Sequence, residues 1–365
     1  MAANSENLEN NMTDMTTPEM YNICRAEDNF LPFMFSRSQW VPHVGAALAY
    51  VLIIQNIIII RIFLRKELLS PVSILLSMLA LSDTLSVFCW FVPEHIGSLL
   101  GYFSGSSFES YSIITSFYEQ YPFCVIAYIS RNILSSGFHS TAIIITTTLG
   151  IQKTIVLLCP FLSKSRFTNK CAAIIVFNVF ILCLGLEIPY AMFFDFSPIS
   201  GGKCCKSLRM DSFTVKAFFD FSHHLRSGIL SVSILIQLLT TIFITSKLTC
   251  RRNTLWRDSK AVRRRNRRST IIVIYITAIF ILSELPSVLV SIFLELRITT
   301  HFTGYTLQYL PLIISFGCFF NFWLYLIMSQ RFRNELIVKR NSSRRSMRSS
   351  VVIVWIRLWL TFFLE

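Results

Sequence analysis

Charge is scarce in this chain. Only 15% of the 365 residues are charged, whereas 53% are hydrophobic, and acidic residues number just 20. A soluble protein of this length carries about 25% charged residues, which coat its surface. The scarcity therefore excludes an ordinary soluble domain, and membrane lipid is the expected partner of the excess apolar surface.

The charge that is present is mostly positive. The chain has 34 basic residues and a formal net charge of +14. These residues are nearly absent from the long apolar runs and cluster between them. Such alternation is typical of a membrane topology signal, so we expect no nucleic-acid partner.

Motifs of catalysis are also missing. The sequence contains no P-loop, no His-Glu-x-x-His helix and no serine nucleophile elbow. His223 and His224 are adjacent, which places them about 100° apart on a helix and makes shared metal ligation awkward. We therefore expect no enzymatic activity, no metal centre and no cofactor.

Long apolar runs make up most of the sequence between residues 40 and 328. Each is long enough to cross about 30 Å of hydrocarbon as a helix. The seven runs are Trp40–Phe63, Pro71–Val92, Cys124–Val156, Cys171–Phe193, Leu225–Leu248, Ser269–Leu294 and Tyr305–Met328. They predict an all-α fold, in which a seven-transmembrane helix bundle over residues 40–328 lies between a segment 1–39 and a tail 329–365.

The basic residues also predict an orientation. Most of them lie in the first, third and fifth connections and in the tail, as in Arg263–Arg268, and basic connections stay in the cytosol. Segment 1–39 is then extracellular, and its sequon at Asn11 is a glycosylation site on the correct side. These features predict a multi-pass protein of the plasma membrane.

Four cysteines fall outside the cell in this topology: Cys24, Cys124, Cys204 and Cys205. Cys124 opens the third apolar run, and Cys204 and Cys205 lie in the long connection before the fifth. A disulfide between Cys124 and one of these two would hold that connection over the mouth of the bundle. The sequence leaves open which of the two pairs. It also leaves open whether Cys24 pairs with the one of Cys204 and Cys205 that Cys124 does not take.

Polar residues inside the apolar runs are costly in lipid and face the bundle interior. Asn56, Asp83, Asn321 and Tyr325 all fall in the cytosolic halves of their runs, which predicts one shared polar cluster. The cluster is either interhelical hydrogen bonding that holds the bundle together, or a hydrated switch coupled to helix movement.

A second group of polar residues lies at mid-membrane or near the outer ends of the runs. Glu284 precedes Pro286, at which the helix should kink, so it is either a ligand anchor or hinge element, or an acid paired to a neighbouring helix. His139 is a candidate pocket residue or an interior histidine with a satisfied hydrogen bond. Glu187 and Glu94 are further candidates for a ligand pocket.

Several of these stretches resemble one family. Ser70–Asp83 resembles the start of helix two in rhodopsin-like (class A) G-protein-coupled receptors. Phe138-His139-Ser140 with Leu149–Lys153 is similar to helix three of the peptide branch that includes the sex-peptide and myosuppressin receptors and nematode serpentine receptors. Glu284-Leu285-Pro286 resembles the Glu-x-Pro of helix six in that branch. Asn321–Arg333 resembles its helix-seven ending and the short amphipathic helix that follows.

The resemblance implies a receptor for a short extracellular peptide with an amidated C-terminus, of the Arg-Phe-amide type, that activates heterotrimeric G proteins. The implied ligand-binding residues are Glu284, His139, Glu187 and Glu94. The residues implied in activation and G-protein coupling are Asn56, Asp83, Gln152, Lys153, Asn321, Tyr325 and Pro286.

The chain departs from the family at the cytosolic end of helix three. Lys153 stands where the family has an Arg, and Thr154 replaces the Tyr that follows it. Lys keeps the positive charge but loses the planar fork of five donors, so the exchange is not conservative.

The tail offers two further partners. A Ser- and Arg-rich stretch at 341–350 precedes fifteen mostly apolar residues, which are too few to span the membrane but could lie along its inner surface. Phosphorylation of the serines would reverse the local charge and offer a site to arrestin-type partners.

Two other functions remain open from the sequence. One is a chemosensory receptor for small molecules, because the acidic extracellular segment favours a peptide only modestly. The other is a polytopic transporter, although the internal repeats and matching broken helices that many transporters show are not apparent. No filter-like motif of a channel is present either.

Overall fold

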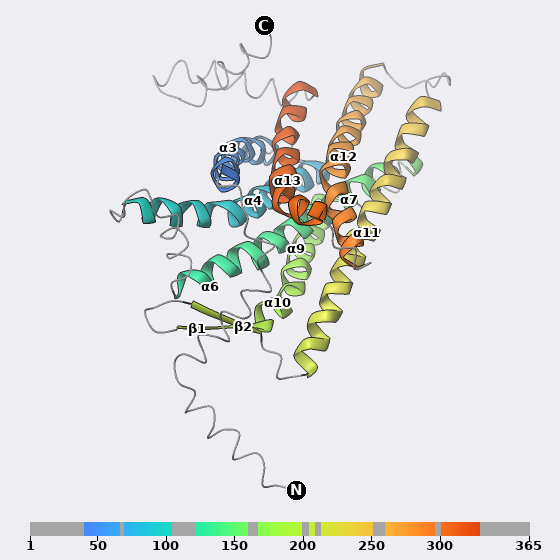
Figure 1. The fold of residues 1–365 in the computed structure, drawn as a ribbon. Coiled ribbons are helices and arrows are strands. Elements are labelled where there is room, and N and C mark those ends of the chain that lie inside the picture. The colour runs from blue at the N-terminus through green and yellow to red at the C-terminus, as the bar shows by residue number, and fades with distance from the viewer. Residues whose placement is uncertain are drawn as a thin grey trace, which may run out of the picture.

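The computed structural model describes residues 40–65, 69–103, 121–159, 167–198, 204–208, 213–250, 260–295 and 301–328 (Figure 1). Segment 1–39 with Asn11, and the tail 329–365 with its predicted amphipathic helix and serines, lie outside the described residues.

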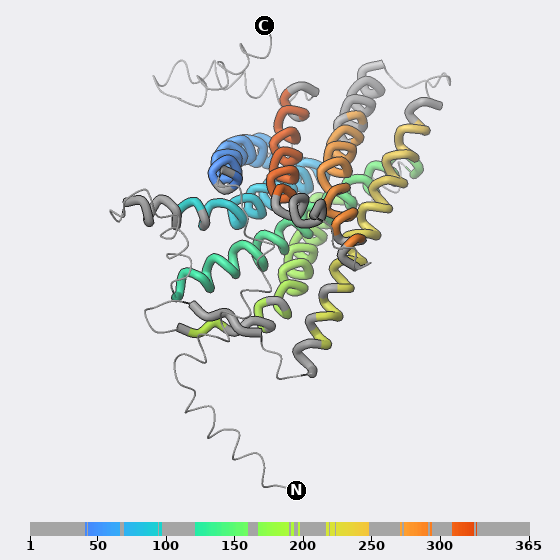
Figure 2. Tube along the Cα trace, in the orientation of Figure 1, coloured from blue at the N-terminus to red at the C-terminus, as the bar shows by residue number. Residues whose placement is uncertain are grey.

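The described residues are helical apart from one hairpin (Figures 1 and 2). The helices are α3 (Trp40–Phe63), α4 (Pro71–Phe103), α6 (Phe123–Tyr128), η2 (Ile129–Leu134), α7 (Ser135–Leu158), α9 (Asn169–Leu186), α10 (Ile188–Phe193), α11 (Phe213–Cys250), α12 (Lys260–Glu295) and α13 (His301–Met328). The strands are β1 (Phe194–Pro198) and β2 (Cys204–Leu208).

Every predicted apolar run is helical. The third run consists of α6, η2 and α7 in succession, and the fourth consists of α9 and α10. α4 continues through Pro93 to Phe103, eleven residues past the predicted end of its run.

Five helical segments among the described residues are long and apolar enough to cross a membrane. They are His43–Phe63, Pro71–Pro93, Phe123–Leu158, Asn169–Leu186 and Asp220–Lys247. The apolar stretches described in α12 and α13 are shorter, at Ile274–Val290 and Tyr309–Leu324. The chain is thus a helical, multi-pass membrane protein, and the count of seven crossings stays a prediction.

The outer surface of the bundle suits lipid. On α9, Ile174, Phe177 and Ile181 are all more than half exposed, and on α11 Leu239 and Ile242 are too. Exposed apolar side chains at this density would be unfavourable in water but cost nothing against acyl chains.

The bundle interior is packed around two groups of buried side chains. The first includes Leu75, Leu79, Ile145, Leu149 and Phe322, and it joins α4, α7 and α13. The second includes Ala46, Leu52 and Phe91. It joins the N-terminal half of α3 and the C-terminal half of α4 to α13.

Two glycines let helices approach closely at the edges of this core. A Cβ on Gly45 of α3 would overlap the buried ring of Phe91 on α4. A Cβ on Gly317 of α13 would lie 2.8 Å from the side chain of Ser283 on α12. Small residues at helix interfaces are how membrane helices pack without a hydrophobic driving force.

The hairpin is the one departure from the predicted all-α class in the part of the chain that the structure describes. β1 pairs with β2 antiparallel, with Ser197 opposite Cys205 and Pro198 opposite Cys204. The ring of Phe196 on β1 lies 5.2 Å from that of Tyr128 on α6, so the hairpin contacts the start of the third apolar run.

The predicted disulfide falls partly within the described residues. Cys124 is disulfide-bonded, whereas the side chains of Cys204 and Cys205 lie outside those described, so the pairing stays a prediction. The free cysteines among the described residues are Cys89, Cys159, Cys171, Cys183 and Cys318.

Candidate functional site

A small polar cavity lies inside the bundle between α4, α7, α12 and α13. Its volume is about 10 Å³, which is room for about one water molecule. Its polar lining consists of Asp83, His139, Ser283, Glu284 and Asn321. Four helices thus contribute titratable or amide side chains to a single buried point.

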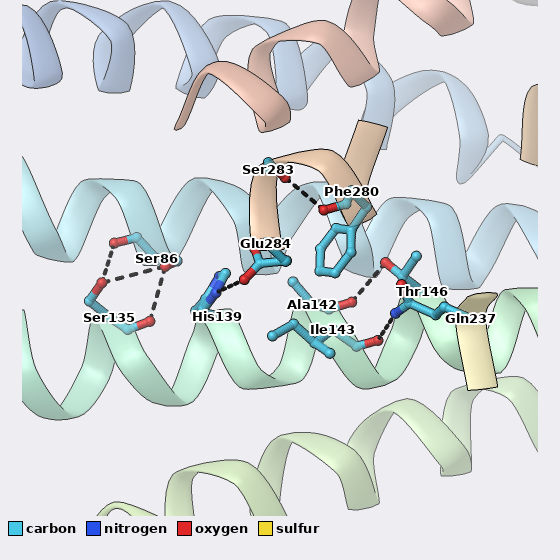
Figure 3. Close-up of polar contacts among 10 residues, drawn as sticks. All are labelled: Ser86, Ser135, His139, Ala142, Ile143, Thr146, Gln237, Phe280, Ser283 and Glu284. Carbon is cyan, nitrogen blue, oxygen red and sulfur yellow. Dashed lines mark hydrogen bonds and ion pairs between the residues drawn. The ribbon is translucent and has the colours of Figure 1, made fainter. Parts of the chain in front are cut away.

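His139 and Glu284 form the link between α7 and α12 in this cavity (Figure 3). The Nε2 atom of His139 lies 3.2 Å from Oε2 of Glu284, and the Glu284 residue is only 2% exposed. Of the two predicted roles for Glu284, the geometry favours the acid paired to a neighbouring helix. The two residues are 145 positions apart in the sequence, so only tertiary packing brings them together.

The second carboxylate oxygen of Glu284 takes no part in the contact with His139. Its Oε1 atom is buried and has no hydrogen-bond partner among the described atoms, and the same holds for Oδ1 of Asn321. Buried acceptors without a partner are costly, and both residues line the cavity. A water molecule in the cavity would satisfy both acceptors.

Pro286 follows Glu284 by two positions in the C-terminal third of α12. Its ring nitrogen cannot donate the helical hydrogen bond to the carbonyl of Leu282, which weakens the helix at that turn. The ion pair therefore attaches to α12 directly beside the point where this helix bends most easily.

Asp83 and Asn321 link α4 to α13 on the other side of the cavity. The side-chain amide of Asn321 donates to Oδ2 of Asp83 over 3.3 Å, and both residues are buried. This contact unites two of the four residues predicted to form one cluster.

The other two members of the predicted cluster are placed differently. Asn56 donates over 2.7 Å to the hydroxyl of Thr84, the residue after Asp83, and so it faces α4 beside the acid rather than contacting it. The Tyr325 side chain lies outside those described, although its backbone belongs to α13.

Glu187 is also engaged within the bundle. It is 1% exposed, accepts a hydrogen bond of 3.0 Å from Ser136 on α7, and lies 3.3 Å from the guanidinium of Arg226 on α11. Glu187 and Arg226 border a second cavity of about 10 Å³. The backbone of Glu94 lies in α4, but its side chain is outside those described.

Gln152 and Lys153 lie near the C-terminal end of α7. Gln152 is 5% exposed, and its side-chain carbonyl is buried without a partner among the described atoms. Lys153 is half-buried. The two residues are separated from the cavity by three to four turns of helix.

Two further interhelical contacts were not predicted from the sequence (Figure 3). Ser86 and Ser135 each donate to the other's backbone carbonyl, over 3.0 and 2.8 Å, and so join α4 to α7. Gln237 of α11 is fully buried and donates to the Ile143 carbonyl over 3.1 Å. It also donates to the Thr147 hydroxyl over 2.9 Å. For the second contact, the sequence did offer a signal, because Gln237 is the single Gln in the apolar run after Leu225. Isolated serines such as Ser86 and Ser135 give no such signal.

The main polar contacts of the cavity link helices to one another. The described side chains of the cavity include two acids, an amide, an imidazole, a hydroxyl and a thiol. The contacts between His139 and Glu284 and between Asp83 and Asn321 each join one helix to another. Compared with models of known protein families, the chain gives no match, and compared with curated proteins it gives none either.

Proposed function

We propose that the chain is a seven-transmembrane receptor of the plasma membrane, with its N-terminus outside the cell. It binds a short amidated peptide of the Arg-Phe-amide type and activates heterotrimeric G proteins. The observation that carries the proposal is the buried contact between His139 and Glu284, which ties α7 to α12 beside Pro286.

Seven crossings are supported by helix length. α12 has 36 residues and α13 has 28, and both exceed the roughly 20 residues that cross a bilayer. Their described apolar stretches occupy only the middle parts of these helices. With the five longer spans, they account for all seven runs and leave the basic connections on one side.

The cavity couples the helices that an activation step must move. His139 and Glu284 hold α12 against α7, and the contact between Asp83 and Asn321 holds α13 against α4. A ligand shifts such an equilibrium only by interacting differently with its two states. In our proposal the resting state has both contacts, and the active state loses the one at Glu284.

The ligand pairs with the same acids. Glu284 and Glu187 already face His139 and Arg226, so a cationic peptide gains an acid only by displacing an internal partner. Binding and release of the interhelical contact then become one event. This explains how a peptide that arrives from outside would free α12 to swing about Pro286, with Lys153 at the end that meets the G protein.

The test is a functional screen of the full-length chain. Cells that express it with a promiscuous G protein should give a saturable calcium response to one or more short amidated peptides, and the free-acid forms should be inactive. A response to small amines or acids instead would indicate the chemosensory alternative. Peptide-independent uptake of a solute into vesicles that contain the chain would indicate a transporter.

A matched pair of variants separates ligand contact from expression. Glu187→Gln should weaken the response to a cationic peptide, whereas Lys170→Gln, at an exposed position in the first turn of α9 on the predicted cytosolic side, should leave it unchanged. Equal responses from both variants at matched surface expression would remove Glu187 from the ligand site.

A further inference from the structure

Two histidines face each other where α3 begins and α4 nears its end. The Nδ1 atoms of His43 and His95 are 3.5 Å apart, and their ring centroids are 5.6 Å apart with the ring planes at 82°. The two residues are 52 positions apart and come from different helices. Neither takes part in the polar cavity or in any contact used above.

The packing of α3 on α4 fixes this meeting. Gly45 lies against Phe91 and Asn56 bonds to Thr84, so the two helices run antiparallel in close contact. The absence of a Cβ at Gly45, one helical half-turn from His43, lets the helices approach at this end. Helix packing therefore places the two residues side by side at the adjoining ends of α3 and α4.

The pair is open to solvent at the edge of the membrane. His43 is exposed and His95 is half-buried. His43 is the first residue of its membrane-spanning segment, and His95 lies two positions past the end of the next one at Pro93. The ring of Tyr50, 6.0 Å from that of His95, bounds the site on the membrane side. An ion from the aqueous phase can therefore reach the site without entering the bilayer.

The His95 imidazole is suited to bind as a neutral ligand. Burial lowers the pKa of His95, and the neighbouring His43 lowers it further. A lowered pKa keeps the ring deprotonated at neutral pH, which is the form that coordinates metals. Two neutral imidazoles that face each other through Nδ1 can also share one hydrogen bond, which is the purely structural alternative.

We propose that His43 and His95 form a two-histidine binding site for a divalent transition metal, with Zn²⁺ as the reference ion. A tetrahedral Zn²⁺ with Zn–N bonds of about 2.0–2.1 Å separates two ligand nitrogens by about 3.4 Å and their ring centroids by about 5 Å. The observed distances of 3.5 and 5.6 Å are close to both values, so small rotations of the two side chains suffice.

The chemistry of the site sets its ligand class and strength. Imidazole nitrogen suits Zn²⁺, Cu²⁺ and Ni²⁺ rather than Ca²⁺ or Mg²⁺, which prefer oxygen ligands. Two protein ligands leave the remaining positions to water, so the binding is reversible and weaker than at a closed four-ligand site. The bound ion would clamp the ends of α3 and α4 together and stabilise the bundle in proportion to its occupancy.

The experiment uses the purified full-length chain in nanodiscs at pH 7.4, with its free thiols alkylated so that cysteine does not bind the metal. Isothermal titration with ZnCl₂ compares the wild type with His43→Ala, His95→Gln and the double variant. His224→Ala is the control, because it removes an exposed histidine on α11 instead. Unfolding temperatures without metal confirm that each variant is folded.

The expected result is a one-ion binding event with a micromolar dissociation constant in the wild type and in the control. Each single variant should bind at least tenfold more weakly, and the rise in unfolding temperature with Zn²⁺ should vanish in the double variant. Binding should also weaken at least tenfold at pH 5.5. An unchanged isotherm in the double variant, or no saturable binding by the wild type, would overturn the proposal.

Discussion

Removal of the contact between His139 and Glu284 should cost a definite amount of stability. The pair is 3.2 Å long, and the Glu284 side chain is 3% exposed against 19% for His139. Hydrogen bonds to charged groups contribute about 1.5–3 kcal/mol in buried sites of soluble proteins. Measured side-chain couplings in a membrane bundle are smaller, at about 0.6 and up to about 1.7 kcal/mol. We therefore expect a coupling energy of about 1–2 kcal/mol.

The same coupling energy determines how much the loss of the contact changes basal G-protein activation. If the contact exists only in the resting state, its loss shifts the balance between the two states by the full coupling energy. A shift of about 1.4 kcal/mol changes their ratio about tenfold. Glu284→Ala should therefore raise ligand-independent G-protein activation several-fold and up to about tenfold at matched surface expression.

A double-mutant cycle makes the test quantitative. His139→Ala, Glu284→Ala and the combination are compared by thermal unfolding in nanodiscs and by nucleotide exchange on a G protein. Ser283→Ala is the control, since among the described residues its hydroxyl donates to the Phe280 carbonyl of its own helix. Additive stability effects would refute the contact. A clear coupling in stability with unchanged basal activity would leave the contact standing and refute its role as a switch.

Three further predictions concern other parts of the bundle. Gln237→Leu removes the donor to the Ile143 carbonyl and should lower the unfolding free energy by about 1 kcal/mol, measured by thermal denaturation; an unchanged midpoint would contradict this. Gly45→Ala places a methyl group against the buried Phe91 ring and should destabilise the protein by about 1–3 kcal/mol in the same assay, with Gly228→Ala, in open space, as a neutral control. Lys153→Arg restores the planar fork of donors and should increase agonist-stimulated nucleotide exchange, whereas equal or lower exchange would argue against a coupling role.

Local sequence was sufficient to locate the helices, although several of them extend beyond the predicted runs. The first run was predicted at Trp40–Phe63 and α3 has those bounds, because the cost of exposing polar groups to lipid limits where an apolar run can begin and end. The β1–β2 hairpin was not predicted, because two five-residue strands inside a polar connection leave no periodic signal long enough to detect.

The sequence predicted which polar residues belong to the candidate site, but not which of them contact one another. Asp83, Glu284 and Asn321 stood out because polar groups inside apolar runs face the interior of a bundle. Their partners did not follow from the sequence, and Asn56, expected to join Asp83, bonds to Thr84 instead. A rotation of about 100° per residue decides which neighbour a side chain meets, and helix packing sets that rotation.

The amino-acid sequence by itself therefore determined that this chain is helical, apolar and multi-pass, since burial in lipid depends on composition along each run. Only the tertiary structure decided which distant residues meet: His139 with Glu284 across 145 positions, and Asp83 with Asn321 across 238. Those contacts depend on the rotation and closeness of packed helices, to which residues such as Gly45 and Gly317 contribute, and no local pattern records them.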